Sequence, residues 1–190
     1  MPNLDEIVAG AAVDRDARDW RQRMTKPPRA TFPPGVPVRV RMQTSQGDMT
    51  FRMLTDVAPM HVTSFAYLAR LGFFDGLAFH RVISRFMAQG GCPKGDGSGG
   101  PGYRMDGECD PKVRHDRSGL LSAANSGPGT DGSQFFITFV PTPWLDDKHT
   151  IFGELIEGAE VLRKLEAAGS ESGQPREPLR IEKVTVEQSA

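Results

Sequence analysis

The chain has 190 residues, enough for one domain with an appendage but too few for two separate hydrophobic cores. Its 23 basic and 24 acidic side chains nearly cancel to a net charge of -1, and no run of like charge points to a nucleic acid or a membrane surface as a partner. No apolar run approaches the roughly 18 residues of a membrane-spanning helix, and acidic residues interrupt the N-terminus, where a secretory signal would be apolar. We therefore expect a soluble, cytoplasmic protein.

The first 36 residues differ in composition from the rest of the chain. Leu4, Ile7 and Val8 recur at helical spacing behind Asn3, a good N-cap, and predict a short amphipathic helix. Prolines at four positions between residues 27 and 34 then predict an extended linker. We therefore divide the chain into an N-terminal extension, 1–36, and a domain, 37–190. Two roles for the extension stay open: a docking helix for a partner, or an extra layer packed on the domain.

The domain shows mostly the period of two that is typical of β-strands. Alternation over 38–53 around the turn SQGD predicts a β-hairpin, and helices are expected at 58–72 and 158–169, each followed or bounded by glycine. Further strands are expected at 77–83, 86–91, 119–125, 133–140, 150–156 and 179–188. About eight short strands and two helices predict a mainly β fold, a closed eight-stranded antiparallel barrel with two capping α-helices.

The glycine-rich segment 90–103 contains the spacing G-x-G-x-x-G from Gly95 to Gly100, which is typical of dinucleotide sites. Pro101 follows at once and no helical period comes after it, so no helix N-terminus is available for a phosphate. We interpret the segment as a long surface loop. Cys92, Cys109 and His115 match no zinc spacing, and the cysteines are expected to be reduced thiols. We predict neither a metal nor a cofactor.

Two polar residues stand out in the apolar run LAFHRVISRFMAQGG, namely Arg81 and Gln89. Burying an arginine is unfavourable unless its donors are used. From the residues alone, Arg81 is therefore either paired with a carboxylate or directed at a ligand from a strand that faces a pocket.

Three long motifs resemble one known family. FHRVISRFMAQGG (79–91), GLLSAANSGPGTDGSQFFIT (119–138) and WLDDKHTIFGEL (144–155) closely resemble the cyclophilins, the cyclosporin-binding peptidyl-prolyl cis-trans isomerases. The loop CPKGDGSGGPGY (92–103) looks like the compact bacterial branch of that family. The resemblance extends from about residue 37 to 188. The chain departs from it at Ser84 and Arg85, where the family usually has Pro-Gly.

The resemblance implies a surface groove in which Arg81 is the catalytic residue. It also implies proline-containing peptides and unfolded client proteins as partners, a cyclosporin-type inhibitor and a monomeric state. The groove would hold the proline ring in an apolar pocket, bind the peptide backbone beside it, and carry one aromatic residue at its rim. The implied residues are Phe86, Met87, Phe136, Leu145 and His149 in the pocket, Gln89, Ala124, Asn125 and Gln134 along the substrate, and Trp144 at the rim.

Rotation about an X-Pro bond makes and breaks no covalent bond, so a hydrogen-bond donor such as Arg81 suffices for catalysis. A different class of function keeps the same groove but uses it only for binding, as a proline-peptide module or a chaperone with little catalysis. The presence of Arg81 favours the isomerase, because a module that only binds needs no donor for a twisted nitrogen.

Overall fold

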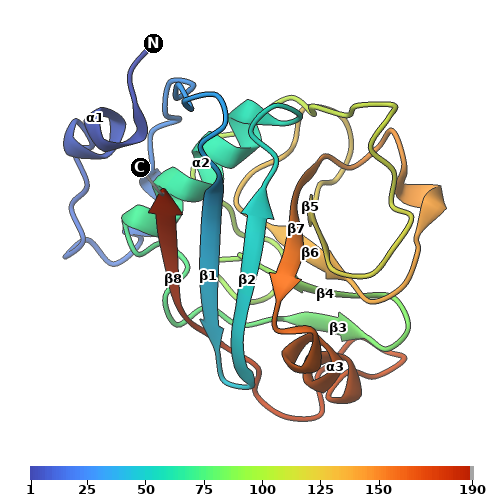
Figure 1. Ribbon diagram of the computed structural model, residues 1–190. Helices are drawn as coiled ribbons and strands as arrows, with labels where there is room; N and C mark the ends of the chain where they lie inside the picture. The colour runs from blue at the N-terminus through green and yellow to red at the C-terminus, as the bar shows by residue number, and fades with distance from the viewer. Residues whose placement is uncertain (189–190) are drawn as a thin grey trace.

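Eight antiparallel strands in one sheet form the body of the protein in this computed structural model, which describes residues 1–188 (Figure 1). Their order is β3-β4-β6-β5-β7-β2-β1-β8, and the predicted mainly β, eight-stranded architecture is confirmed. The strands are β1 (Val38–Thr44), β2 (Gly47–Met53), β3 (Arg81–Ile83), β4 (Met87–Gly90), β5 (Leu120–Ala123), β6 (Phe135–Thr138), β7 (Ile151–Glu157) and β8 (Ile181–Gln188).

The sheet is a curled half-barrel, so the prediction of a closed barrel was wrong. β3 and β8 are its two edges and do not pair with each other. The segment 76–79, just before β3, bonds to residues 179–181 through the isolated bridge Ala78–Arg180 and the main-chain hydrogen bonds beside it. β3 has three residues, and its outer edge is already used: Val82 N–H donates to the Gly173 carbonyl (2.8 Å) and Ser170 N–H to the Val82 carbonyl (3.1 Å). A strand so short and already bonded on its outer side has no free row of groups with which to pair β8.

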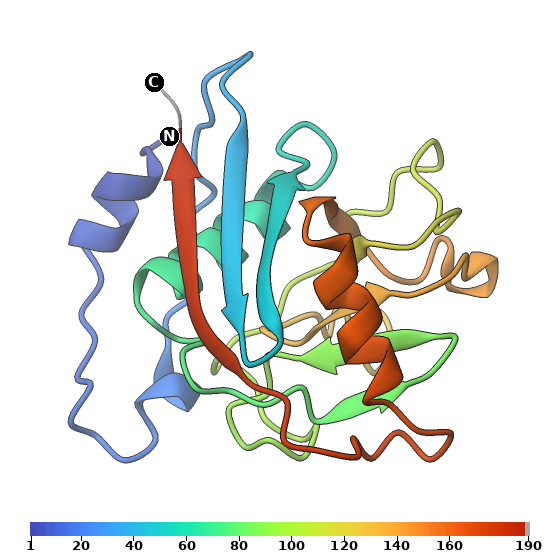
Figure 2. The same cartoon turned by 60° about the horizontal axis from the view of Figure 1, so that its bottom comes forward.

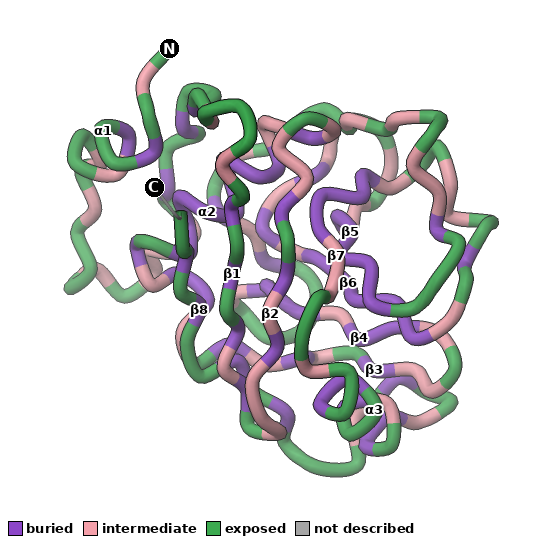
Figure 3. Tube along the Cα trace, viewed as in Figure 1, coloured by how far each residue is buried: buried purple, intermediate pink, exposed green. Residues whose placement is uncertain are grey.

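Two helices cover the sheet, as the glycine-bounded apolar patterns predicted. α2 (Pro59–Arg70) packs against β7 and β8, and α3 (Ala159–Ala167) packs beside β2, β3 and β4. The buried stretches gather along α2 and the strands that face it (Figure 3). α2 begins with a proline, which needs no N–H partner there, and Gly72 follows its end at φ +69°. Within residues 1–188, no helix is both long and apolar enough to cross a membrane.

The N-terminal extension packs on this body. α1 (Leu4–Ala9) forms where the spacing predicted a helix, and Asn3 and Glu6 cap it reciprocally through side chain and backbone. Leu4 and Ile7 are buried in the same apolar cluster as the sheet, and α1 lies beside α2 (Figure 2). Of the two roles left open, the structure therefore shows the packed layer. The division of the chain at residue 36 stays a prediction.

Candidate active site

Arg81 lies on the edge strand β3 and faces solvent. Its cross-strand partner in the register is Gln89 of β4, and Arg81 Nη1 donates a hydrogen bond of 3.3 Å to Gln89 Oε1. Arg81 is exposed and, among residues 1–188, forms no ion pair with a carboxylate, so of the two alternatives for Arg81 the structure does not show the carboxylate pair. The side chains of β3 alternate, so Val82 takes the buried position and Arg81 the exposed one.

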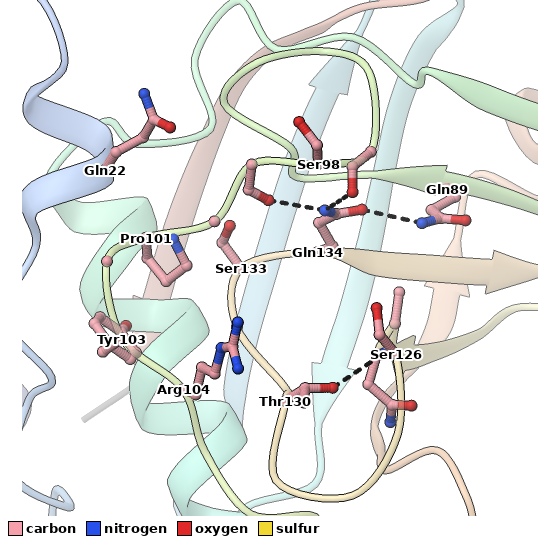
Figure 4. Close-up of a pocket in the computed structure, with 17 residues that line it drawn as sticks. Gln22, Gln89, Ser98, Pro101, Tyr103, Arg104, Ser126, Thr130, Ser133 and Gln134 are labelled. Atoms are coloured by element: carbon pink, nitrogen blue, oxygen red, sulfur yellow. Dashed lines mark hydrogen bonds between the residues drawn. The ribbon is translucent and has the colours of Figure 1, made fainter.

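A chain of amides connects Arg81 to the glycine-rich loop. Gln89 Nε2 donates to Gln134 Oε1 at 3.0 Å, and Gln134 Nε2 donates to the carbonyl oxygens of Gly97 (2.7 Å) and Gly99 (2.8 Å), as drawn in Figure 4. The amide oxygen and the amide nitrogen of Gln134 therefore both form hydrogen bonds inside the protein. This arrangement makes Gln134 a residue that positions Gln89 and the loop.

The residues predicted to hold a proline ring lie next to this chain. Phe136 of β6 is opposite Gln89 in the register, and the His149 ring stands edge-on to Phe136 with centroids 5.5 Å apart. His149 Nδ1 donates to the Ala123 carbonyl at 2.9 Å, which fixes the ring. The remaining members follow at the same face: Met87 on β4, Phe86 with its ring 5.9 Å from that of Trp144, and Leu145 with Trp144 on the 3₁₀ turn η2 (Pro143–Leu145). Trp144 is 57% exposed, as expected of a rim residue.

His115 supports this apolar group from behind, a role that the sequence analysis missed. Its ring stacks on Phe136 with centroids 6.0 Å apart and an interplanar angle of 17°, and its Nδ1 lies 2.8 Å from Asp146 Oδ1. Burial lowers the pKa of His115 more than Asp146 raises it, which favours the neutral ring. A neutral, buried imidazole can lie against Phe136 as an apolar surface would. No motif in the sequence marks this contact.

Next to Gln89, the hydrogen-bond partner of Arg81, lies an open cavity of about 560 Å³. Four predicted substrate-binding residues line it: Gln89, Ala124, Asn125 and Gln134. Its other walls are loop residues 97–104, Ser126, Thr130, Gly132, Ser133 and, from the N-terminal extension, Gln22. The sequence analysis named neither Gln22 nor Arg104, because nothing in their local pattern indicates that they meet here.

Asn125 lines the cavity, and its main chain is the part that is free to bind a ligand. Its side chain is used internally: Nδ2 donates to the Lys148 carbonyl (3.0 Å) and Oδ1 accepts from the Gly127 N–H (3.2 Å). Within the described part of the chain, the backbone N–H and carbonyl of Asn125 have no hydrogen-bond partner. These two groups are therefore the ones free to bind a peptide backbone.

An exposed arginine beside an aromatic group and a polar cavity, on a curled eight-stranded sheet with covering helices, defines a peptide-binding isomerase of the cyclophilin class. The family model described as "Cyclophilin type peptidyl-prolyl cis-trans isomerase/CLD" matches residues 39–186. The chain belongs to this family, as the sequence motifs predicted.

Similar proteins agree with this assignment. Peptidyl-prolyl cis-trans isomerase cypE of Dictyostelium discoideum is 44% identical over 149 residues, which cover 77% of this chain and 96% of that protein. The isomerase ppi1 of Schizosaccharomyces pombe is 45% identical over 146 residues, 75% of this chain and 94% of that one. A solved cyclophilin-type isomerase of Cryptosporidium parvum superposes with a TM-score of 0.77 at 34% identity, covering 81% of this chain and 99% of that one. A second structure of that protein, in the presence of the dipeptide Ala-Pro, gives 0.76 at 36% identity and covers 80% and 99%.

Proposed function

We propose that this isomerase accelerates X-Pro rotation by donating a hydrogen bond from Arg81 to the prolyl nitrogen of the twisted bond. The observation that carries the proposal is the state of the Arg81 side chain. Its guanidinium is exposed beside the aromatic group, has no carboxylate partner among residues 1–188, and makes one long hydrogen bond to Gln89. Most of its five N–H donors therefore remain available to a ligand.

The chemistry needs a donor at one place only. In a planar amide the nitrogen lone pair is conjugated and accepts no hydrogen bond, and the barrier to rotation is about 18–20 kcal/mol. As the bond twists, conjugation is lost and the lone pair becomes an acceptor. A donor at that position binds the twisted state better than either planar isomer and so lowers the barrier. A guanidinium stays charged at all working pH values, so this donor needs no proton transfer.

The neighbouring residues restrict rotation to the one bond. Phe136, Met87 and their aromatic neighbours would receive the proline ring and exclude water, while the main chain of Asn125 would hold the peptide. Gly173 packs against Arg81: it has φ +88°, and a Cβ atom there would lie 3.0 Å from Arg81 Cγ, so a side chain at position 173 would press on Arg81. Unfolded chains with accessible prolines are the proposed clients of a monomeric, cytoplasmic enzyme, and a cyclosporin-type inhibitor would cover the same groove.

Replacement of Arg81 tests the proposal. Arg81→Ala should lower kcat/KM on a short Ala-Pro peptide by a factor of about 100 or more, and Arg81→Lys should recover little, because a point charge lacks the guanidinium fork. Exchange between cis and trans signals in NMR measures the rate directly and separates catalysis from binding alone. Arg39→Ala is the matched control, since Arg39 is an exposed arginine on β1 far along the sheet order. A folded Arg81→Ala protein with the full rate contradicts the mechanism, and an unfolded one shows that Arg81 is structural.

A further inference from the structure

The N-terminal extension forms one end of the cavity next to Gln89. Gln22 lies on the 3₁₀ turn η1 (Trp20–Arg23) and lines the cavity, and Figure 4 shows it at the end opposite Gln89. Directly after η1, Met24 N–H donates a hydrogen bond of 2.8 Å to the carbonyl oxygen of Pro101 in the glycine-rich loop. The family model begins at residue 39, so this wall is a feature of this chain outside the part that the family model describes.

The opposite side of η1 is fastened to the body of the protein. Arg21 Nε donates to the Phe73 carbonyl (2.7 Å) and Arg21 Nη2 to the Asp75 carbonyl (2.8 Å). The Trp20 ring stands edge-on to Phe73 with centroids 6.3 Å apart, and the Arg21 guanidinium lies 4.9 Å from the Trp20 centroid. Side-chain and main-chain contacts on two faces therefore hold Gln22 at a defined position.

The cavity has the chemistry of a site for an acidic side chain. Arg104 lines it, is exposed, and forms no ion pair within residues 1–188. Gln22 adds a neutral amide side chain to the lining, whereas the Thr130 hydroxyl already donates to the Gly127 carbonyl (2.7 Å). None of the residues that line the cavity is acidic. A carboxylate placed there would meet the Arg104 guanidinium and the Gln22 amide, with no like charge among the lining residues to repel it.

Gln89 links the cavity to Arg81. It bonds to Arg81 on one side and lines the cavity on the other, and Asn125, whose main chain is free, also lines it. A peptide whose proline lies beside Arg81 would therefore bring a neighbouring side chain into the cavity. We propose that Gln22 and Arg104 form a subsite for an acidic side chain close to the proline, so that the extension takes part in substrate selection. The inference rests on the proposed function of the groove.

Paired peptides test the subsite. Glu and Gln are placed in turn at each of two positions on either side of the proline, and kcat/KM is measured for the full-length protein. We expect a preference for Glu over Gln at one position of about three- to fivefold, the size of a partly exposed ion pair. Arg104→Gln should abolish the preference, Gln22→Glu should reduce or reverse it, and Gln22→Lys should increase it.

Arg23→Ala is the matched control, because Arg23 lies on the same 3₁₀ turn, pairs with Asp19 and has a side chain that is 71% exposed. This variant should leave the Glu-to-Gln ratio unchanged. The subsite is rejected if no position prefers Glu, and the role of the extension is rejected if the preference is the same in Gln22→Glu and Gln22→Lys as in the native protein. Arg81→Ala separates the two hypotheses: a full rate in that variant contradicts the arginine mechanism, while the ratio still reports on the subsite.

Discussion

The carbonyl oxygen of Gln22 lies 2.5 Å from the point that a Cβ atom on Gly102 would occupy. Gly102 has φ +97°, a backbone conformation that residues with a side chain rarely adopt. The extension and the glycine-rich loop thus approach each other so closely that no side chain fits between them. The close approach of Gln22 therefore requires glycine at position 102, which the G-x-G-x-x-G spacing of the loop does not indicate.

Gly102→Ala should therefore loosen the extension. A methyl group would strain the backbone and push against Gln22, at a cost of about 1–3 kcal/mol in the free energy of unfolding. Urea denaturation measures this loss, and limited proteolysis should cut between residues 10 and 30 sooner than in the native protein. Gly100→Ala is the control, because nothing lies within 4 Å of a Cβ atom there. Equal stability of the two variants would show that the contact is easily relieved.

Leu4→Ala tests the packing of α1. Leu4 is 1% exposed in the main apolar cluster, so truncation to alanine should cost about 2–4 kcal/mol of stability, measured by urea denaturation. The rate on an Ala-Pro peptide should not change, because α1 borders neither the groove nor the cavity. Arg18→Ala, at an exposed residue of the same extension, should change neither quantity. A neutral Leu4→Ala would mean that α1 adds nothing to the stability of the domain.

Arg85→Gly should stabilise the protein. Arg85 has φ +59°, which is unfavourable for any residue with a side chain, and its N–H bond to Glu166 Oε1 (2.9 Å) would survive the substitution. We expect a gain of about 0.5–1 kcal/mol, after the greater freedom of glycine in the unfolded chain is taken into account. The thermal midpoint should rise accordingly. Asp147→Gly, at φ +62°, is the contrasting variant and should show no gain, because Asp147 also pairs with Arg114.

His61 predicts a dependence of stability on pH. Its side chain is 3% exposed, with Nδ1 2.7 Å from Glu108 Oε2 and Nε2 2.8 Å from Asp131 Oδ2. Burial disfavours the charged ring, but the hydrogen bonds to Asp131 and Glu108 outweigh it, so the pKa of His61 is raised. The stabilisation is therefore complete below the pKa of the unfolded state, about 6.5, and is lost as pH rises through the higher folded-state pKa.

The difference in unfolding free energy between the native protein and His61→Asn should accordingly shrink as pH rises above the ordinary histidine pKa of about 6.5. The pH dependence of stability due to His80 should have the opposite sign, because burial lowers the pKa of His80. Relative to His80→Asn, the native protein should lose stability as pH falls below about 6.5. Urea titrations of the three proteins across this range measure both trends. A His61 difference that grows with pH would show that the ring is neutral in the folded protein.

Local patterns were enough to predict the elements. Val38, Val40 and Met42 alternate with polar residues and form a strand with one buried face, and Gly72 ends α2 in a left-handed conformation. The run 77–83 shows the limit of such patterns. Only Arg81–Ile83 joins the sheet, because the main chain of Leu77 and Phe79 bonds to residues 179 and 181 at the seam between the sheet edges.

The motifs predicted the family and which residues would gather around Arg81, but not how each would be used. The register opposite Gln89 leaves Arg81 exposed, and the internal bonds of Asn125 leave only its main chain for a ligand. Gln22 reaches the cavity through contacts with segments more than 50 residues away, such as those of Arg21 with Phe73 and Asp75. The spacing of residues along the chain does not predict such long-range contacts, so only the folded structure reveals them.

The short edge strand β3, whose outer groups are already bonded, also affects whether this protein aggregates with its proposed clients. Unfolded chains carry unpaired backbone groups that add readily to a bare sheet edge, and such strand addition leads to aggregation. At β3, Gly173 and Ser170 already take up the outward-facing groups of Val82. At the other edge, Asp75 Oδ1 accepts from the Val184 N–H (3.4 Å), and Glu187 places a charge farther along β8. With the β3 edge covered by its own loop and the β8 edge interrupted by Asp75 and Glu187, the sheet offers a bound unfolded chain few free groups on which to add as a further strand.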